Sequence, residues 1–441
     1  MGNCNTKSQK SHFSPRAALA ALGVKIRQMQ FFKPVNEHVD IHQKTVKHTP
    51  LQKLYDAFIA ILAGSHGMVE INKRLRNDPG LQAAFGRTDC AEQSVVQRTL
   101  DACTTENVEE IQTAVDEIYH QHSAGYRHAY KKTYQLLDVD MSGLPCGRKA
   151  AFATKGYFAK QRNRRGRQLG RVLATHYHEI VVDRLFAGNQ QLTHAFQPLI
   201  EAAEQTLDLD EAQRARTILR VDSGGGSLND LNWALERGYQ LHGKDYAGKR
   251  ARKLAETVAE WVDDPKHPGR QVGWVTAEPT EYARPVRRIA VRCRKKNQQW
   301  GIGVLITTLS DKDILALTQQ PCHRAQDPHA VLLAMVYFYD QRSGGVETSF
   351  KEDHQGLGIH KRNKQRFAAQ QVLEQLNVLA HNVIVWARAW LAPHFPQLAR
   401  LGIQRIVRDI FPISGFLGFD AVGHVSRLTL NQADPFSKGL I

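Results

Sequence analysis

The spacing of apolar residues changes near Tyr134, and this change most strongly limits what the chain can fold into. Upstream of it, apolar residues recur every three or four positions, as in residues 50–86, which predicts amphipathic helices. That pattern is broken at Gly64 and again at Asp78, where turns are expected. Residues 1–130 are therefore predicted to form a helical domain with a basic leader.

Downstream of Tyr134, short runs of strand-forming residues alternate with helical patterns. This alternation predicts an α/β fold in which consecutive strands and helices build one sheet, with its first part in residues 131–244. The expected elements are a strand at 134–143, two strands within 171–188, a helix at 192–209, a strand at 215–222, a helix at 227–238 and a strand at 239–245.

Residues 245–318 interrupt this order. Three runs in the segment alternate apolar and polar residues like antiparallel strands, so we predict an inserted β-rich subdomain. Helical patterns return at 328–341 and 366–391, and residues 319–395 are therefore predicted to complete the α/β core. Residues 396–441 are left as a C-terminal extension.

The charge of the chain favours a polyanionic partner. Lysine and arginine total 59 against 43 aspartates and glutamates, which gives a formal net charge of +16. Nucleic acid is preferred to a membrane as that partner, because the longest apolar runs, such as residues 330–339, are too short to cross a bilayer. The six cysteines are scattered without a CxxC pair, so no zinc site or disulfide framework is predicted.

Three acidic residues lie at places where a fold of this class can bring them together. Asp140 lies near the end of the first predicted strand, with Asp138 two residues earlier on the same face. Asp222 ends a later strand, and Glu347 follows the apolar run at 328–341. Side chains at strand ends of an α/β sheet converge on the crevice where ligands bind. The choice between Asp138 and Asp140 stays open on this reasoning, and Glu352 competes with Glu347.

Such a cluster suits metal-dependent chemistry on phosphodiesters. Hydrolysis and strand transfer are in-line displacements at phosphorus, and two divalent ions about 3.5–4 Å apart can activate the nucleophile and stabilise the leaving oxygen. Mg²⁺ prefers hard oxygen ligands and needs few carboxylates. The structural alternative is that an aspartate at a strand end makes a turn or caps the next helix, for which residues 222–226, DSGGG, are well suited.

The contexts of the three acids resemble the motifs of bacterial insertion-sequence transposases of the DDE class. The first strand reads LLDVDMSGLPCG, and the second motif reads ILRVDSGGGSLNDLNWALERGYQLHGK. The third reads YDQRSGGVETSFKED, which resembles the YREK signature, and the helical pattern at 365–388 is similar to the helix that follows it in that group. The resemblance covers about residues 130–395, and it is weaker in the N-terminal helices.

This resemblance implies an RNase H-like catalytic core with the inserted β-rich subdomain and a two-metal mechanism. Asp140, Asp222 and Glu347 would be the catalytic residues and would hold two Mg²⁺ ions per active site, with Mn²⁺ able to substitute. Tyr339 and Arg342 match the tyrosine and arginine of the signature, which contact DNA phosphates in the family.

The match to the signature has two departures. Four residues separate Arg342 from Glu347, where the family usually has three. The lysine expected seven residues after the glutamate is His354, and Lys351, one helical turn after Glu347, is the other residue available for its role.

Two basic segments are further candidates for DNA contacts. The first, residues 160–171, is expected to be a loop that holds the DNA backbone or, alternatively, a solubilising loop. The second, residues 284–296, is expected to be a ribbon with one positive face. Trp300 is either a base-stacking residue or part of the core. The candidates in the first segment are Arg162, Arg164, Arg165 and Arg167.

The family resemblance implies a transposase that cleaves insertion-sequence ends and joins them to target DNA. It would act on double-stranded DNA as a homodimer, with the helical N-terminal domain, residues 1–130, binding the terminal inverted repeats, and it would lie in the bacterial cytoplasm near the nucleoid. Two alternatives remain: an RNase H-like nuclease without strand transfer, and a transposase-derived DNA-binding protein that has lost the chemistry.

Overall fold

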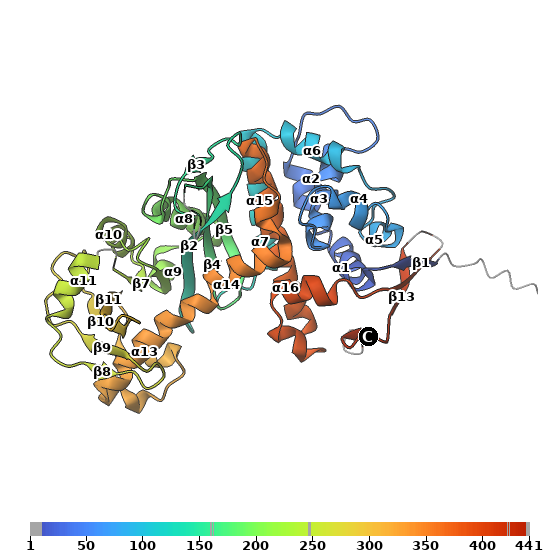
Figure 1. Cartoon of the computed structure of the whole chain (residues 1–441). Helices are drawn as coiled ribbons and strands as arrows, with labels where there is room; N and C mark the ends of the chain where they lie inside the picture. Colours follow the sequence, from blue (N-terminus) through green and yellow to red (C-terminus); the bar gives the residue numbers. More distant parts are fainter. Residues whose placement is uncertain are drawn as a thin grey trace, which may run out of the picture. The chain divides into compact units, whose positions relative to one another are not determined.

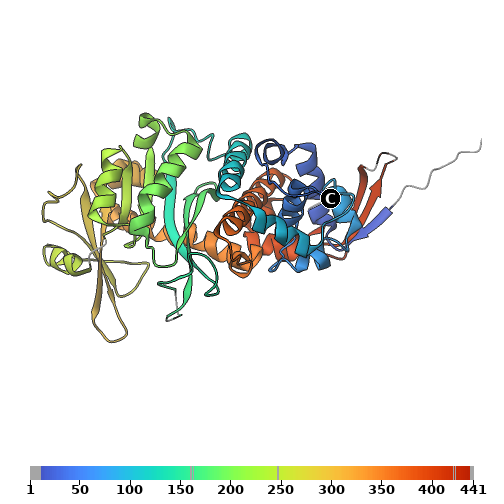
Figure 2. The same ribbon diagram turned by 90° about the horizontal axis from the view of Figure 1, so that it is seen from above.

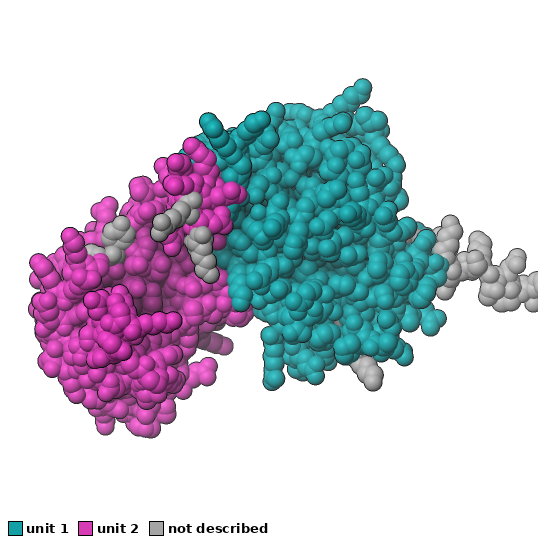
Figure 3. Space-filling view, in the orientation of Figure 1, with its two compact units in different colours: residues 1–123, 144–154, 350–441 teal, residues 124–143, 155–349 magenta. Residues whose placement is uncertain are grey.

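The computed structural model describes residues 11–158, 161, 163–245, 248–420, 422 and 424–437. Within it the chain forms two compact units (Figure 3). Unit 1 comprises Met1–Ser123, Leu144–Thr154 and Phe350–Ile441, and unit 2 comprises Ala124–Gly143 and Lys155–Ser349. The predicted division into five parts, with boundaries at residues 130, 244, 318 and 395, differs from this division into two units, and it stays a prediction.

The helices predicted upstream of residue 130 are confirmed, and they make up most of the N-terminal part of unit 1. Their bounds are α1 (Ala17–Gln28), α2 (Lys33–His38), α3 (Pro50–Leu62), α4 (Glu70–Arg74), α5 (Pro79–Ala84), α6 (Gln93–Ala102) and α7 (Thr105–His122).

Local sequence explains where these helices begin and end. α3 begins with a capping box, in which the Thr49 hydroxyl accepts a hydrogen bond from the Gln52 amide while the Gln52 side chain accepts one from the Thr49 amide. Soon after α3 ends, Gly64 adopts a φ of 72°, which a residue with a side chain rarely adopts. Asp78 caps α5 by accepting from the Leu81 amide. Both predicted breaks are therefore confirmed.

Helix α15 (Phe367–Leu391) is the central element of unit 1. Its middle stretch is buried on all sides, as expected for a helix that is apolar around most of its circumference. It contacts α3, α6 and α7, and Figures 1 and 2 both show it beside α7. The C-terminal helical pattern at 366–391 is thereby confirmed, with a role in packing the N-terminal helices.

A small sheet in unit 1 was not predicted. β1 (Ser11–Ser14) pairs antiparallel with β12 (Gly415–Phe419), which pairs antiparallel with β13 (Val425–Leu430). The sequence predicts only a basic leader at the start of the chain, because four residues are too few to show a strand period. The rest of unit 1 consists of short turns of helix: η3 (Asp353–Leu357), η4 (Ile359–Lys361), η5 (Pro396–Arg400), α16 (Ile403–Arg405) and η6 (Ile406–Ile410).

Unit 2 is a mixed α/β unit built on a large sheet of mixed strand direction. The strand order is β3-β4-β2-β6-β7-β11-β10-β9-β8, and β5 also pairs with β4. β2, β6 and β7 are parallel neighbours, whereas β4 and β5 form an antiparallel pair. These strands are β2 (Gln135–Pro145), β3 (Thr154–Lys155), β4 (Arg165–Ala174), β5 (Glu179–Ala187), β6 (Thr217–Val221) and β7 (Gln240–Lys244).

The segment predicted as a β-rich insertion extends this same sheet. β11 pairs antiparallel with β7, and β10, β9 and β8 follow in order. The segment also contains two helices that the alternation of residues did not reveal. Its elements are α11 (Gly248–Ala255), β8 (Val262–Asp263), β9 (Arg270–Trp274), β10 (Arg287–Arg294), β11 (Trp300–Thr307) and α12 (Asp311–Leu317).

One hydrophobic core joins the parallel strands to the extension. It includes Leu136 of β2, Ile218 of β6, Ile289 of β10 and Met335 of α13, so helix α13 packs against both parts of the sheet.

None of the helices in the described residues is long and apolar enough to cross a membrane. The other helices of the unit are α8 (Leu192–Leu207), α9 (Glu211–Ala215), α10 (Leu228–Glu236), η1 (Cys322–Gln326), α13 (Pro328–Asp340), η2 (Gln341–Gly344) and the first residues of α14 (Val346–Glu352).

A buried ion pair ties the β4–β5 hairpin to the start of α14. Arg171 lies opposite Asp183 in the strand register, and its guanidinium donates to both carboxylate oxygens at 2.8 and 2.7 Å. The remaining guanidinium nitrogen, Nη1, donates to the Ser349 hydroxyl at 3.0 Å. Because Ser349 lies two residues after Glu347, this contact helps to fix the helix that carries one of the three candidate acids.

Asp183→Asn is expected to destabilise the protein by about 3–5 kcal/mol, because it leaves the Arg171 charge buried without its counter-charge. The midpoint of urea unfolding, followed by tryptophan fluorescence, measures the loss. Asp263→Asn is the matched control, since Asp263 is exposed and its loss should change stability by no more than about 0.5 kcal/mol. Equal midpoints for the two variants would contradict this account of the hairpin.

Candidate active site

Asp140 and Asp222 follow matched positions on two neighbouring parallel strands. The pairing of β2 with β6 runs as far as Val139 opposite Val221, and the two aspartates are the next residues along each strand. Since the strands are parallel, both side chains emerge at the same edge of the sheet. The convergence expected from the sequence is therefore present for this pair.

Glu347 reaches the same region from the helical segment that follows the core helix α13. Arg342 lies on η2, directly after α13, and Glu347 lies in the first turn of α14. The side chain of Glu347 is 52 % exposed, whereas Arg342 retains only 4 % side-chain exposure. The segment from η2 to the first turn of α14 thus carries one buried cation, Arg342, and one accessible carboxylate, Glu347.

The Arg342 guanidinium binds two of the three acids. Its Nη2 lies 2.9 Å from Oδ2 of Asp140, and its Nη1 donates to Oε1 of Glu347 at 2.7 Å. Its Nε has no hydrogen-bond partner, although it is buried. Burial opposes the charge of this guanidinium, but Asp140 and Asp222 prevail and raise the pKa of Arg342. Arg342 therefore supplies the positive charge at the centre of this acidic cluster.

The donor atoms of the cluster suit a hard divalent cation, because Asp140, Asp222 and Glu347 offer only carboxylate oxygens. In the described parts of the chain, no three His, Cys, Asp or Glu side chains are grouped closely enough to surround one ion. In this cluster the guanidinium of Arg342 lies between the carboxylates of Asp140 and Glu347, which keeps the two carboxylates apart. The chemistry of the donor set fits Mg²⁺, and binding would require Arg342 to release at least one carboxylate.

Asp140 carries the clearest electrostatic signature of the cluster. Burial raises the pKa of its carboxyl group to about 6; Arg342 opposes that rise, while Asp222 and Glu347 add to it. The carboxyl also accepts a hydrogen bond from the Met141 amide at 2.8 Å. A carboxyl group that resists ionisation beside two further acids is typical of sites that hold a cation or transfer a proton.

Tyr339 lies beside the same cluster. Burial raises the pKa of its phenol to about 12, Arg342 opposes this, and the three acids add to it. The structure therefore brings together Asp140, Asp222, Glu347, Arg342 and Tyr339. The predicted roles of these residues in metal and DNA binding remain predictions.

Asp222 takes part in a turn at the end of its strand, as the structural alternative to a metal-binding role predicts. Its Oδ1 accepts a hydrogen bond from the Gly224 amide at 2.7 Å. It does not cap the next helix, because Ser227 is the N-cap of α10 and accepts from the Asp230 amide. One carboxylate oxygen of Asp222 is thus used to shape the loop, and this contact holds the side chain at the sheet edge.

Asp138, the alternative to Asp140, is bound by the protein itself. It lies opposite Arg220 in the register of β2 and β6, and the guanidinium donates to both of its oxygens at 2.6 and 2.8 Å. Both side chains are fully buried. Arg220 was missed as a site residue, although an arginine inside the buried strand ILRV was a signal that it needed an acidic partner.

The segment between Arg342 and Glu347 contains a glycine that a close contact requires. Gly345 lies so close to Asp138 that a Cβ at this position would overlap its Oδ2. Only glycine lets the backbone pass the buried Asp138–Arg220 pair at this distance. The segment between Arg342 and Glu347 therefore fits closely over that pair.

The residues that follow Glu347 have contacts of their own within unit 1. Glu352, the competing third acid, accepts a hydrogen bond from the Gln404 amide at 2.7 Å. His354, which stands where the family has lysine, stacks on His360 with ring centroids 5.0 Å apart. Lys351 is exposed on α14. Whether His354 or Lys351 serves in place of the signature lysine stays open.

The basic run at 160–171 is less of a loop than expected. Arg164 is exposed and Arg165 is half-buried at the start of β4, whereas Arg162 lies outside the described residues. Arg167 is only 1 % exposed, so its side chain offers almost no surface to DNA. The run enters a strand that the sheet buries, and this accounts for the difference from a solvated loop.

Trp300 is half-buried at the start of β11, between two arginines of β10. The guanidinium of Arg292 lies 4.7 Å from its ring centroid and that of Arg294 lies 4.9 Å away. Arg292 also lies 3.9 Å from the Trp261 ring. The basic ribbon thus alternates with aromatic rings on one face, and the role of Trp300 in DNA binding stays a prediction.

Comparisons with known proteins found a family model and a solved structure that are similar to this chain. The family model described as "Transposase DDE domain group 1" matches residues 19–418. No curated protein matches the chain. Among solved structures, one described as the cryo-EM structure of the piggyBac transposase synaptic complex with hairpin DNA is similar, with a TM-score of 0.48 and 12 % sequence identity, over 91 % of this chain and 82 % of that chain.

Asp140→Asn is expected to stabilise the metal-free protein, and to do so more at pH 7 than at pH 5. Because the pKa of Asp140 is raised to about 6 in the folded state, against about 3.9 in an unfolded chain, the wild type loses stability as pH rises from about 4 to 6. Asparagine carries no charge at either pH. Thermal unfolding in EDTA measures the difference in Tm, and a difference that does not widen at pH 7 would contradict the assignment.

Proposed function

Because the chain belongs to the group 1 family of DDE transposase domains, we propose that it is a DNA transposase that cleaves the ends of an insertion sequence and joins the freed 3′-hydroxyl groups to target DNA. DDE transposases generally cut and transfer DNA strands with the help of divalent metal ions. The observation that carries the finer proposal is the convergence of Asp140, Asp222 and Glu347 around the guanidinium of Arg342.

We assign the catalytic core to the RNase H-like fold. Supporting this, β2 lies between β4 and the parallel pair β6–β7, and β4 forms an antiparallel hairpin with β5. The extension β11-β10-β9-β8 stands where the inserted β-rich subdomain is expected, before the glutamate. In this arrangement the three acids come from the central strand, its parallel neighbour and a later helix.

Asp140, Asp222 and Glu347 would hold two Mg²⁺ ions, or Mn²⁺ in their place. The ions would supply activation of the attacking hydroxyl group and stabilisation of the leaving oxygen. The protein's part is to hold three oxygen ligands on two strand ends and one helix, so that they approach a phosphate from a rigid base. The exposed side chain of Glu347 is the ligand with the most freedom to adjust.

Arg342 would then have two successive partners. Without metal it neutralises Asp140 and Glu347, and the charge of bound ions would remove the need for that neutralisation. A released guanidinium can bind a phosphate through two parallel hydrogen bonds, which is the contact expected of the signature arginine. We expect Tyr339, which lies beside the same acids, to take part in such a contact.

The partners we propose are double-stranded DNA, at the terminal inverted repeats and at the target, and a second copy of the chain when DNA is bound. The formal charge of +16 supports a polyanionic partner. Arg164 and Arg165, at the start of β4, and the Arg292–Trp300–Arg294 ribbon are the surfaces of unit 2 that we assign to backbone contacts. The helical N-terminal part would recognise the repeats.

Cleavage of labelled DNA that carries the ends of the encoding element tests the proposal. With Mg²⁺, Glu347→Gln should bind this DNA but cut it more than about 100-fold more slowly, since even indirect partners of a metal ligand are worth about 10–100-fold. Glu352→Gln is the matched control. It should cut normally, because glutamine still offers an oxygen to the Gln404 amide.

The products of the same reaction separate the alternatives. Joining of the cut ends to a target plasmid is expected of a transposase, whereas cutting without joining would indicate a nuclease. A wild-type protein that binds the ends and never cuts them would contradict the proposal and indicate a DNA-binding derivative.

Arg342→Gln is expected to bind Mn²⁺ about tenfold more tightly than the wild type in the absence of DNA, because two ion pairs no longer compete with the metal for Asp140 and Glu347. Paramagnetic resonance of free Mn²⁺ measures the affinity. Arg164→Gln removes the same charge from an exposed position and serves as control. Unchanged or weaker binding by a folded Arg342→Gln protein would contradict this role.

A further inference from the structure

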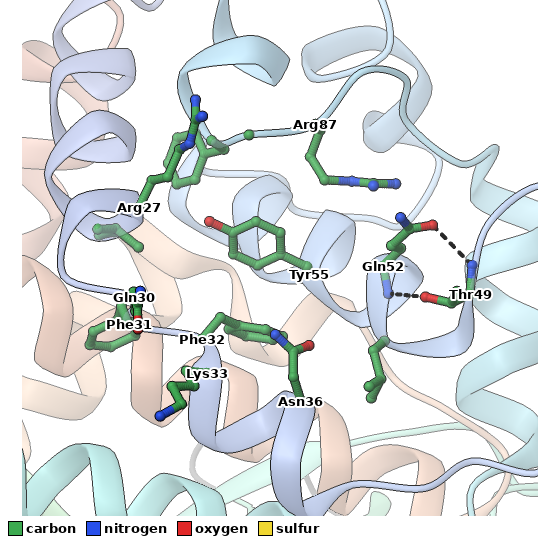
Figure 4. Close-up of a pocket in the computed structure, with 14 residues that line it drawn as sticks. Arg27, Gln30, Phe31, Phe32, Lys33, Asn36, Thr49, Gln52, Tyr55 and Arg87 are labelled. Carbon is green, nitrogen blue, oxygen red and sulfur yellow. Dashed lines mark hydrogen bonds between the residues drawn. The ribbon is translucent and has the colours of Figure 1, made fainter. Parts of the chain in front are cut away.

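A pocket of about 630 Å³ lies in the N-terminal helical part of unit 1. It is formed by the end of α1, by α2, by the first two turns of α3 and by residues 85–87 after α5. Figure 4 shows Tyr55 in its middle, with Arg27, Lys33 and Arg87 placed around it. Its volume falls within the range of sites that bind small organic groups.

Aromatic rings form the base of the pocket. Tyr55 and Phe32 lie with ring centroids 4.6 Å apart, and Tyr55 and Phe85 make an edge-type contact with ring centroids 6.2 Å apart. Phe32 and Phe85 are buried, whereas Tyr55 is half-buried. Phe85 is also fixed from behind, because it packs directly on Gly23, where any Cβ would overlap the ring. A flat group entering the pocket would therefore meet a rigid aromatic surface at Tyr55.

The rim of the pocket is cationic. Arg27 and Lys33 are exposed, and among the residues that the structure describes no aspartate or glutamate lines the pocket. Lys33 has an exposed ion pair with Glu37 at 3.4 Å, which is too weak to hold its charge away from a stronger anion. Arg87 is held against the wall by Asp56, with contacts of 2.8 and 3.2 Å. The available positive charge thus lies at the mouth, where an anion would remain near solvent.

Carboxamide side chains complete the lining. Gln30, Asn36 and Gln52 line the pocket, and Figure 4 shows Asn36 beside Phe32 and Gln52 between Tyr55 and Thr49. The orientation of Gln52 is set by the capping box of α3, in which its Oε1 accepts from the Thr49 amide at 3.0 Å. Its NH₂ group is therefore directed away from that bond. Carboxamide side chains can form paired hydrogen bonds with the edge of a nucleobase, most often adenine.

We propose that this pocket binds one unpaired nucleotide of DNA, with the base stacked on Tyr55 and the phosphate held by Arg27 and Lys33. The three kinds of side chain match the three parts of such a ligand: rings for the base face, carboxamides for the base edge and cations for the phosphate. A base inside a duplex cannot enter, so the site takes a single-stranded or extruded nucleotide. The proposal rests on the proposed function only in taking DNA as the partner.

Photo-crosslinking locates the bound base. The full-length protein is irradiated with a five-nucleotide single strand that contains 5-iododeoxyuridine, and crosslinked peptides are identified by mass spectrometry. Crosslinks to Tyr55 or Phe32 are expected. Crosslinks that occur only outside residues 26–87, for example at Trp300, would overturn the proposal while leaving the proposed transposase activity untouched.

Affinity for the same strand tests the chemistry. Tyr55→Leu should weaken binding about tenfold, the scale of one lost stacking contact, while Tyr55→Phe should bind like the wild type and shows that the fold tolerates the change. Replacing every base by an abasic site should remove the difference between wild type and Tyr55→Leu. Equal affinities of these two proteins for the intact strand would overturn the proposal.

Salt dependence tests the phosphate contact. Arg27→Gln should lower the slope of log affinity against log salt concentration by about 0.7, the value for one phosphate contact on a single strand. Lys25→Gln is the matched control, because Lys25 is exposed on the same helix but does not line the pocket. Equal slopes for the two variants would overturn the assignment of Arg27. End cleavage by Tyr55→Leu, assayed separately, shows whether the proposed activity stands independently.

Discussion

Arg220 and Asp138 face each other from adjacent parallel strands, with both charges fully buried and two hydrogen bonds between them. The active-site region of unit 2 is built over this pair. A third nitrogen of Arg220 donates to the carbonyl of Phe338 at 2.6 Å, which ties α13 to the sheet, and Gly345 passes so close to Asp138 that no side chain fits there. The segment that carries Arg342 and Glu347 is therefore positioned by a buried salt bridge.

Three buried arginines in unit 2 form ion pairs with acidic residues, and these acidic residues differ in how exposed they are. Asp138 and Asp183 are each held by an arginine that is as buried as they are, and such pairs are costly to break from one side. Arg342 is also buried, but its two partners, Asp140 and Glu347, retain 19 % and 52 % side-chain exposure. Water and ions can reach those carboxylates. Only this third arrangement leaves oxygen ligands that can change partners, which is what a metal site requires.

The sequence revealed the elements better than the contacts between them. The strand and helix order after Tyr134 followed from periodicity, because each element contains enough residues to show its own pattern. The convergence of Asp140 and Asp222 followed from the rule for parallel strand ends. The partners of Asp138 and Glu352 and the burial of Arg167 could not be predicted, since they depend on register and on neighbours that are distant in the chain. The four-residue strand β1 was missed because it is too short to carry a period and needs β12 beside it.

The two proposed sites differ in charge because they would act on different parts of the same polymer. The cluster around Arg342 concentrates carboxylates, which repel DNA until cations neutralise them, so occupancy by metal and approach of phosphate are coupled. The pocket around Tyr55 is lined by no acid within the described part of the chain and can attract a nucleotide without a metal ion. DNA binding in unit 1 and strand chemistry in unit 2 would therefore respond differently to magnesium. Removal of the ion should abolish the chemistry and leave the capture of an unpaired base in place.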